Sequence, residues 1–117
     1  MSQYLKNQDL LKEIKISKDN NQLTLLALDY IYLMTDRIGL EFRYRDKKDF
    51  EDCKSEAILN VLNYWRDFDE NKSTNAFSYF TQMIKMGYAI GYNKIYRKKI
   101  KTISFNVLDN INNIWVI

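Results

Sequence analysis

The sequence contains no proline and only three glycines. Proteins built mainly from β-strands rely on both residues to turn the chain, so their scarcity favours helices. Histidine is absent as well, which removes the most common general base and the most common metal ligand. We therefore expect a helical protein, and we expect neither an enzyme nor a bound metal or other cofactor.

Cysteine is also scarce, because Cys53 is the only one. A lone cysteine forms no internal disulfide and has no partner for a zinc site, which is typical of cytosolic proteins. No stretch approaches the roughly 18–20 continuous apolar residues of a membrane span. The N-terminal residues 1–8 lack the apolar segment of a secretion signal. The sequence therefore predicts a protein that works in the cytoplasm.

Acidic residues are missing from a long part of the chain, between Glu70 and Asp109. Residues 1–70 carry 11 basic and 14 acidic side chains, a net charge of −3. Residues 71–117 carry 7 basic side chains and 1 acidic side chain, a net charge of +6. Such asymmetry indicates two kinds of partner, one that accepts acidic groups and one that is a polyanion.

Apolar residues make up 46% of the 117 residues, which is enough for one hydrophobic core. Their spacing predicts four helices, near residues 7–17, 23–42, 46–66 and 75–101. Asn7 and Asp46 are expected to cap the first and third helices, and a residue of the segment 73–75 the fourth. We predict an all-α fold with a single compact domain of about four helices over residues 1–101. The tail over residues 102–117 has alternating β-branched residues, and its structure stays unassigned.

One candidate site is the acidic surface of the predicted third helix, which contains Asp49, Glu51, Asp52 and Glu56. Asp52 and Glu56 are four residues apart, so both carboxylates lie on the same face of a helix. Paired carboxylates can transfer protons or bind a metal ion. Lysines nearby are suited as counter-charges, so the pattern by itself favours a solvated surface.

The predicted fourth helix carries apolar residues on two faces instead of one. The stripe expected to face the core contains Phe77, Phe80, Ile84, Gly87, Tyr88, Gly91 and Ile95. Gly87 and Gly91 would each weaken an exposed helix by about 1 kcal/mol, so they fit better where another helix approaches closely. The second stripe contains Tyr79, Gln82, Met83, Met86 and Ile90. It is either a second packing surface, which the pattern slightly favours, or a platform on which unpaired bases stack.

A cluster of basic residues ends the predicted fourth helix and consists of Lys94, Arg97, Lys98, Lys99 and Lys101. A basic run at a helix C-terminus often does no more than complement the helix dipole. Here the run continues a segment without acidic residues and lies beside the aromatic stripe, which favours phosphate contacts. Together the basic run and the stripe indicate binding to single-stranded or melted nucleic acid.

Residues 52–85, DCKSEAILNVLNYWRDFDENKSTNAFSYFTQMIK, resemble the second conserved region of sigma-70-type transcription initiation factors. The family pattern is matched in register by Asp52, Glu56-Ala57, Phe68-Asp69, Tyr79 and Ile84-Lys85. A closer similarity, over about residues 23–101, is to the small late-transcription sigma factors of T-even-like bacteriophages, which share the DFDENK…NAFSYFTQ arrangement. The resemblance implies a helical, DNA-binding transcription initiation factor of a bacteriophage, acting in the cytoplasm of the host cell.

The resemblance assigns a partner to each surface. The acidic helix would dock on the clamp coiled coil of the β′ subunit of host core RNA polymerase, through Asp52, Ser55, Glu56, Ile58 and Leu62. Acidic side chains would steer toward a basic coiled coil and pair with it. Promoter melting and −10 recognition would involve Ala76, Ser78, Tyr79, Gln82, Met83 and Met86. Lys85 and the basic run would hold phosphates, and Tyr79 would stack where a base leaves the duplex.

The chain departs from the family in ways that change the expected promoter. Primary sigma factors carry two tryptophans where this chain has Gln82 and Met83, and a phenylalanine where it has Ala76. Met86 replaces a glutamine that reads a base edge, so that direct contact is lost. We therefore expect a reduced sigma factor that prefers AT-rich late promoters and melts DNA only with help.

The C-terminal tail has its own expected partners. In the phage relatives a short C-terminal motif contacts the sliding clamp, and a separate co-activator binds the polymerase flap. The segment VLDNINNIWVI would be a degenerate version of that motif, with a clamp or flap contact through Leu108, Ile114 and Trp115. A packed tail is an equal alternative. Nothing in the chain resembles the helix-turn-helix region that reads a −35 element.

Two other functions stay open at this point. A helical interaction module that binds the polymerase without reading DNA would lack the steep salt dependence of phosphate contacts. A nonspecific single-strand binder would bind naked oligonucleotides tightly without the polymerase, which we do not expect of this chain.

Overall fold

Four α-helices and one short 3-10 helix make up the computed structural model, which describes residues 5–44 and 46–110, with side chains described as far as Arg97. The helices are α1 (Asn7–Asp19), α2 (Leu25–Gly39), α3 (Lys47–Tyr64) and α4 (Ala76–Asn110), and the 3-10 helix η1 (Trp65–Asp67) follows α3. The described residues form no strand. The prediction of an all-α domain of about four helices is therefore confirmed.

Side chains cap the N-termini of α2, α3 and α4. At the start of α3, Asp46 accepts a hydrogen bond from the backbone N–H of Asp49 (2.9 Å). At the start of α4, Asn75 accepts one from the N–H of Ser78 (3.0 Å). Thr24 caps α2 in the same way. Each cap satisfies an N–H that has no partner inside its own helix.

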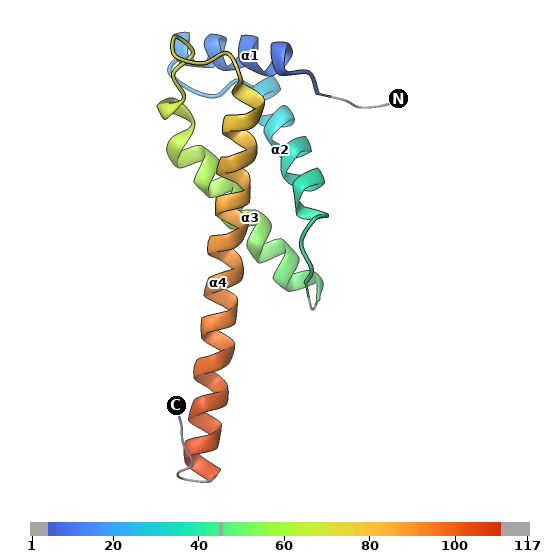
Figure 1. The fold of residues 1–117 in the computed structure, drawn as a ribbon, viewed down its shortest axis with the longest axis vertical. Coiled ribbons are helices and arrows are strands. Elements are labelled where there is room, and N and C mark those ends of the chain that lie inside the picture. Colours follow the sequence, from blue (N-terminus) through green and yellow to red (C-terminus); the bar gives the residue numbers. More distant parts are fainter. Residues whose placement is uncertain (1–4, 45, 111–117) are drawn as a thin grey trace.

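The expected cap of α1 is wrong. Asn7 is the first helical residue, Lys6 occupies the N-cap position, and no side chain caps this helix. The amide of Asn7 instead bridges to the start of α4: its Nδ2 donates to the carbonyl oxygen of Thr74 (2.8 Å), and its Oδ1 accepts from the N–H of Phe77 (2.9 Å). Helix α1 therefore lies across the N-terminal end of α4 (Figure 1).

One hydrophobic core joins all four helices and η1. Its buried apolar residues are Leu10, Ile14, Ala27, Ile31, Met34, Ile38, Cys53, Ala57, Val61, Trp65, Phe68, Ala76, Phe80, Ile84 and Tyr88. The hydroxyl of Tyr88 donates to the carbonyl oxygen of Thr35 (2.7 Å). Burial is the largest cause that raises the pKa of this phenol far above its ordinary value. Because the four helices share one core, they form a single globule.

The predicted core stripe of α4 is correct except at its first residue. Phe80, Ile84, Gly87, Tyr88 and Gly91 are buried, and Ile95 packs partly against the core. Phe77 is 37% exposed. It lies in the first turn of α4, where it borders a small pocket together with Leu5 and Leu33. Phe77 therefore lies at the edge of the core, although its neighbour Ala76 is buried inside it.

Helix α4 continues further than the sequence predicts. It contains 35 residues and ends at Asn110, which corresponds to about 52 Å at 1.5 Å per residue. Residues 102–110 of the predicted tail are thus helical, because extending an existing helix requires no new nucleation step. The C-terminal part of α4 extends beyond the other three helices (Figure 1). Within the described part of the chain, no helix combines the length and the apolar character needed to cross a membrane.

Candidate functional site

Helices α3 and α4 carry both predicted binding surfaces and pack directly against each other. A Cβ atom added to Gly87 would lie 2.4 Å from the Cα of Ala57, and one added to Gly91 would lie 2.9 Å from the Cα of Cys53. These distances leave no room for a side chain, so the two glycines allow the backbones to touch, as their spacing predicts. Higher residue numbers on α4 meet lower numbers on α3, so the two helices run in opposite directions and cross (Figure 1).

One face of α3 combines acidic and apolar groups. Asp52, Ser55 and Leu62 are exposed, as is Leu59, which the sequence prediction omits. These four residues recur every three or four positions, so they share one side of the helix. We refer to them as the α3 surface. The other two predicted polymerase contacts, Glu56 and Ile58, are partly buried beside it.

Glu56 connects the two predicted surfaces. Its Oε2 accepts a hydrogen bond from the Nζ of Lys94 on α4, at 2.8 Å. The Glu56 side chain is 25% exposed and that of Lys94 is 63% exposed. An ion pair this exposed contributes at most about 1 kcal/mol, because water and salt screen it. An ion pair thus joins Glu56, a predicted polymerase contact, to Lys94, a predicted DNA contact.

The residues that the resemblance assigns to the promoter lie at different depths. Ser78, Gln82 and Met86 are exposed. Tyr79 and Met83 are partly buried. Ala76, which is also predicted to contact DNA, is fully buried in the core. The reason is that Ala76 opens α4 at the point where α1 lies across it.

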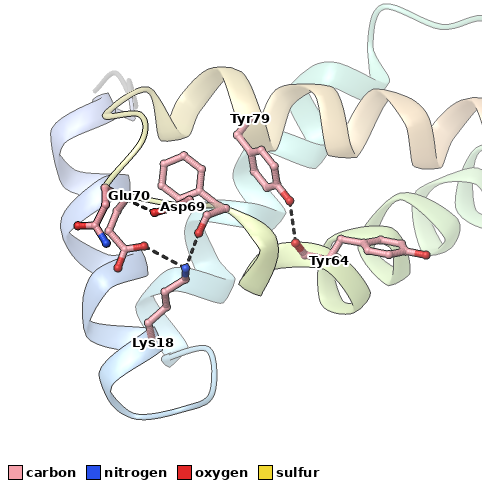
Figure 2. A network of polar contacts seen from close by, with 7 residues as sticks. Lys18, Tyr64, Asp69, Glu70 and Tyr79 are labelled. Carbon is pink, nitrogen blue, oxygen red and sulfur yellow. Dashed lines mark hydrogen bonds and ion pairs between the residues drawn. The ribbon is translucent and has the colours of Figure 1, made fainter.

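Tyr79 is held in place by packing and by a hydrogen bond. The centroid of its ring lies 5.2 Å from that of Phe68. Its hydroxyl donates to the carbonyl oxygen of Tyr64, the last residue of α3, at 2.8 Å (Figure 2). Burial, and to a lesser extent the charge of Asp67, raises the pKa of the Tyr79 phenol. Tyr79 therefore anchors α4 to the end of α3, and only part of its surface is accessible.

The second apolar stripe of α4 divides between packing and solvent. Met83 packs against the core, and Asn60 donates from Nδ2 to the carbonyl oxygen of Met83 (2.8 Å). Met86 and Ile90 are 54% and 40% exposed. The packing interpretation thus holds for Tyr79 and Met83, whereas Met86 and Ile90 remain at the surface.

The basic residues of α4 differ in their surroundings. Lys85 forms an ion pair with Glu41 on the loop after α2, at 3.5 Å. Arg97 is exposed. Lys98, Lys99, Lys101 and Leu108 belong to the helical backbone of α4, but their side chains fall outside the described part. Ile114 and Trp115 lie outside the described residues altogether.

The loop before α4 is fixed to the end of α1. The Nζ of Lys18 donates to the carbonyl oxygen of Phe68 and to Oε1 of Glu70, the latter at 3.0 Å (Figure 2). In the same loop, Asp69 accepts from the N–H of Asn71 (2.9 Å). The pKa of the Glu70 carboxyl is lowered by a hydrogen bond from the backbone N–H of Glu70 and by Lys18. These contacts help to set the direction in which α4 leaves the loop.

Two exposed tyrosines of α4, Tyr92 and Tyr96, are absent from the predicted site. They are four residues apart and share one side of the helix. Their exposure could have been predicted from the sequence, because both lie outside the core stripe that contains Gly87 and Gly91.

Comparisons of this chain with models of known protein families, with curated proteins and with solved structures give no match. The resemblance of residues 52–85 to sigma-70-type factors therefore rests on the sequence pattern alone. The physical basis for a function lies in the surfaces of α3 and α4.

Proposed function

We propose that this chain is a sigma-like transcription initiation factor. It binds host core RNA polymerase at the clamp coiled coil of the β′ subunit and directs the enzyme to AT-rich late promoters of the −10 type. The chain supplies recognition in the cytoplasm of the host cell, and the polymerase supplies the catalysis. A phage co-activator and the sliding clamp are further proposed partners, through the C-terminal tail.

The observation that carries the proposal is that a helix with an exposed acidic surface packs, through another side, against a helix that has no acidic residue before Asp109. Helix α3 contains Asp49, Glu51, Asp52 and Glu56. In α4 the first acidic residue is Asp109, next to its end. The glycine contacts bring the two helices together, so a basic protein on α3 and a polyanion on α4 would be held side by side. A factor that joins polymerase to DNA needs this arrangement.

The α3 surface suits a basic, partly apolar protein partner. The exposed carboxylate of Asp52 would steer a cationic coiled coil toward α3 and pair with it. Leu59 and Leu62, which are 48% and 42% exposed, offer apolar area that such a contact would bury. The mixture of charge and leucine supports a protein, rather than a metal ion, as the partner of this surface.

The outer side of α4 suits DNA. Gln82 is exposed and available to base edges, and Met86 adds exposed apolar surface next to it. Arg97 is exposed further along the same helix, where it can contact phosphate. The packing of Tyr79 against Phe68 limits the ring available for stacking, which supports a factor that melts promoters only with help.

Co-purification of core polymerase with the tagged chain tests the α3 contact. Asp52→Lys should abolish co-purification without loss of helix content, because Asp52 is exposed. Asp29→Lys provides the matched control, since Asp29 is an exposed acidic residue on α2. Glu56→Lys is a less specific test, because it also releases Lys94. Retention of polymerase by Asp52→Lys, or its loss in both variants, would count against docking through α3.

A polymerase-binding regulator that does not read DNA is the second candidate. It is favoured by the burial of Ala76 and the partial burial of Tyr79 and Met83. Salt dependence separates the two functions. Phosphate contacts by α4 should make promoter binding fall steeply between low and moderate salt, whereas a regulator bound only to protein should show little such dependence.

A further inference from the structure

Three tyrosines follow one another at intervals of four residues along α4, and they differ in their surroundings. Tyr88 is fully buried, and its hydroxyl is bound to the carbonyl oxygen of Thr35. Tyr92 and Tyr96 are 49% and 57% exposed. The first ring thus belongs to the core, and the next two lie at the surface.

The sequence around these two rings is basic. Arg97 follows the second ring, and no acidic residue occurs from residue 71 to residue 108. Lys94 lies between the rings in the sequence, but it points to another side of the helix, where it pairs with Glu56. Tyr32 on α2 provides a contrast, because it is exposed but lies between Asp29 and Asp36. Exposed aromatic rings next to a cation, in a segment without acidic residues, are typical of surfaces that bind single-stranded nucleic acid.

The spacing of the two rings suits bases that are not stacked on each other. Residues four apart lie on one side of a helix and differ by about 6 Å along its axis. Neighbouring bases of a duplex are separated by only about 3.4 Å. Tyr92 and Tyr96 therefore match two bases of an extended strand, or one base lying between the rings, better than two stacked neighbours.

We propose that Tyr92 and Tyr96 form a stacking site for unpaired nucleobases, with Arg97 contacting the adjacent phosphate. This inference rests on the proposed function, because it gives the melted DNA strand a contact beyond the residues that the sequence pattern assigns. It also supplies aromatic surface that Tyr79 offers only in part, since the Tyr79 ring packs against Phe68.

The test compares two fluorescent strands of equal length and charge, an oligothymidylate and an abasic strand. Binding of the full chain to a naked strand is expected to be weak, so it is followed by fluorescence anisotropy at low ionic strength, where phosphate contacts are strongest. Tyr92→Ala combined with Tyr96→Ala should weaken binding to the oligothymidylate by at least about fivefold, the lower end of what one stacked base contributes. The same change should leave binding to the abasic strand unaltered, because that strand has no base to stack.

Three control variants make the test specific. Tyr92→Phe combined with Tyr96→Phe keeps both rings and should bind like the unmodified chain. Arg97→Gln should weaken binding to both strands alike, because it removes a phosphate contact. Tyr32→Ala should change neither, and circular dichroism should show the same helix content for every variant.

Several results would overturn the stacking site. These are an equal loss on both strands, no loss on either, or no binding of the oligothymidylate even at low ionic strength. Loss of polymerase co-purification in the double alanine variant would overturn it as well, since the tyrosines would then contact protein. The proposed function is judged separately, because co-purification of the unmodified chain with polymerase involves neither strand.

Discussion

The ammonium of Lys94 lies 2.8 Å from a carboxylate oxygen of Glu56, so an ion pair joins the two surfaces for which we propose different partners. A basic partner that attracts Glu56 would release Lys94 for phosphate. A phosphate that attracts Lys94 would release Glu56 in turn, because coupling between two binding sites is reciprocal. Lys94 is largely exposed, so water and salt screen the pair and this coupling is modest.

Glu56→Gln should raise the affinity of the free chain for a single strand by up to about fivefold, because an exposed ion pair contributes at most about 1 kcal/mol. The gain should fall to that of Asp52→Asn when Lys94 is replaced by glutamine. Asp52→Asn changes the net charge equally, and its effect should be the same with or without Lys94. Fluorescence anisotropy at fixed salt measures all four combinations. A Glu56→Gln effect that is equally large with and without Lys94 would mean that the ion pair does not couple the surfaces.

Gly87→Ala should destabilise the domain although alanine favours helices. The new Cβ would lie 2.4 Å from the backbone of Ala57, so α3 and α4 would have to separate. We expect the free energy of unfolding in urea to fall by about 1–3 kcal/mol, as for other overpacked contacts. Asn93→Ala, at an exposed position of the same helix, should leave the free energy of unfolding unchanged or raise it slightly. An unchanged stability for Gly87→Ala would show that the two backbones are not in contact.

Tyr79→Phe should lower the free energy of unfolding by about 0.5–1.5 kcal/mol, because it removes one hydrogen bond, to the carbonyl of Tyr64. Tyr79→Ala should lower it further, since the packing against Phe68 is also lost. Urea unfolding of both variants measures the difference. If Tyr79→Ala were as stable as the unmodified chain, the ring would not be packed, and stacking on a base would become its main role.

The stability of the domain should decrease in acid partly through Glu70. The pKa of this carboxyl is lowered in the folded chain by its own backbone N–H and by Lys18. The carboxylate therefore favours folding above its ordinary pKa, and this contribution is lost as the pH falls through the lowered pKa. Glu70→Gln should melt at a lower temperature than the unmodified chain near neutral pH, and the two should converge in acid. Equal melting temperatures for the two chains at every pH would contradict this contribution of Glu70.

Features whose partners lie close in the chain were predictable from the sequence. Asp46 and Asn75 each bond to a residue three positions further on, so a short pattern predicts the cap at Asp46 and narrows the cap of α4 to residues 73–75. Asn7 has the same side chain as Asn75, but its partners Thr74 and Phe77 are 67 and 70 residues away. No local pattern distinguishes these two roles, because the tertiary fold decides which donors and acceptors an asparagine meets.

The spacing of apolar residues also leaves open how deeply each one is buried. Gly87 and Gly91 correctly indicate the side of α4 that meets α3. Tyr79 and Tyr96, however, are both tyrosines outside that stripe, and only the first is packed. The difference arises because the end of α3 reaches Tyr79, through the carbonyl of Tyr64, whereas α4 extends beyond the other helices further along (Figure 1).

Run-off transcription tests the central claim most directly. Core polymerase would be supplied with a template that carries an AT-rich late promoter, with and without the chain. We predict a transcript of defined length that requires the chain and that disappears with Asp52→Lys. Identical transcripts in the presence and absence of the chain, at concentrations where it binds the polymerase, would contradict a sigma-like function.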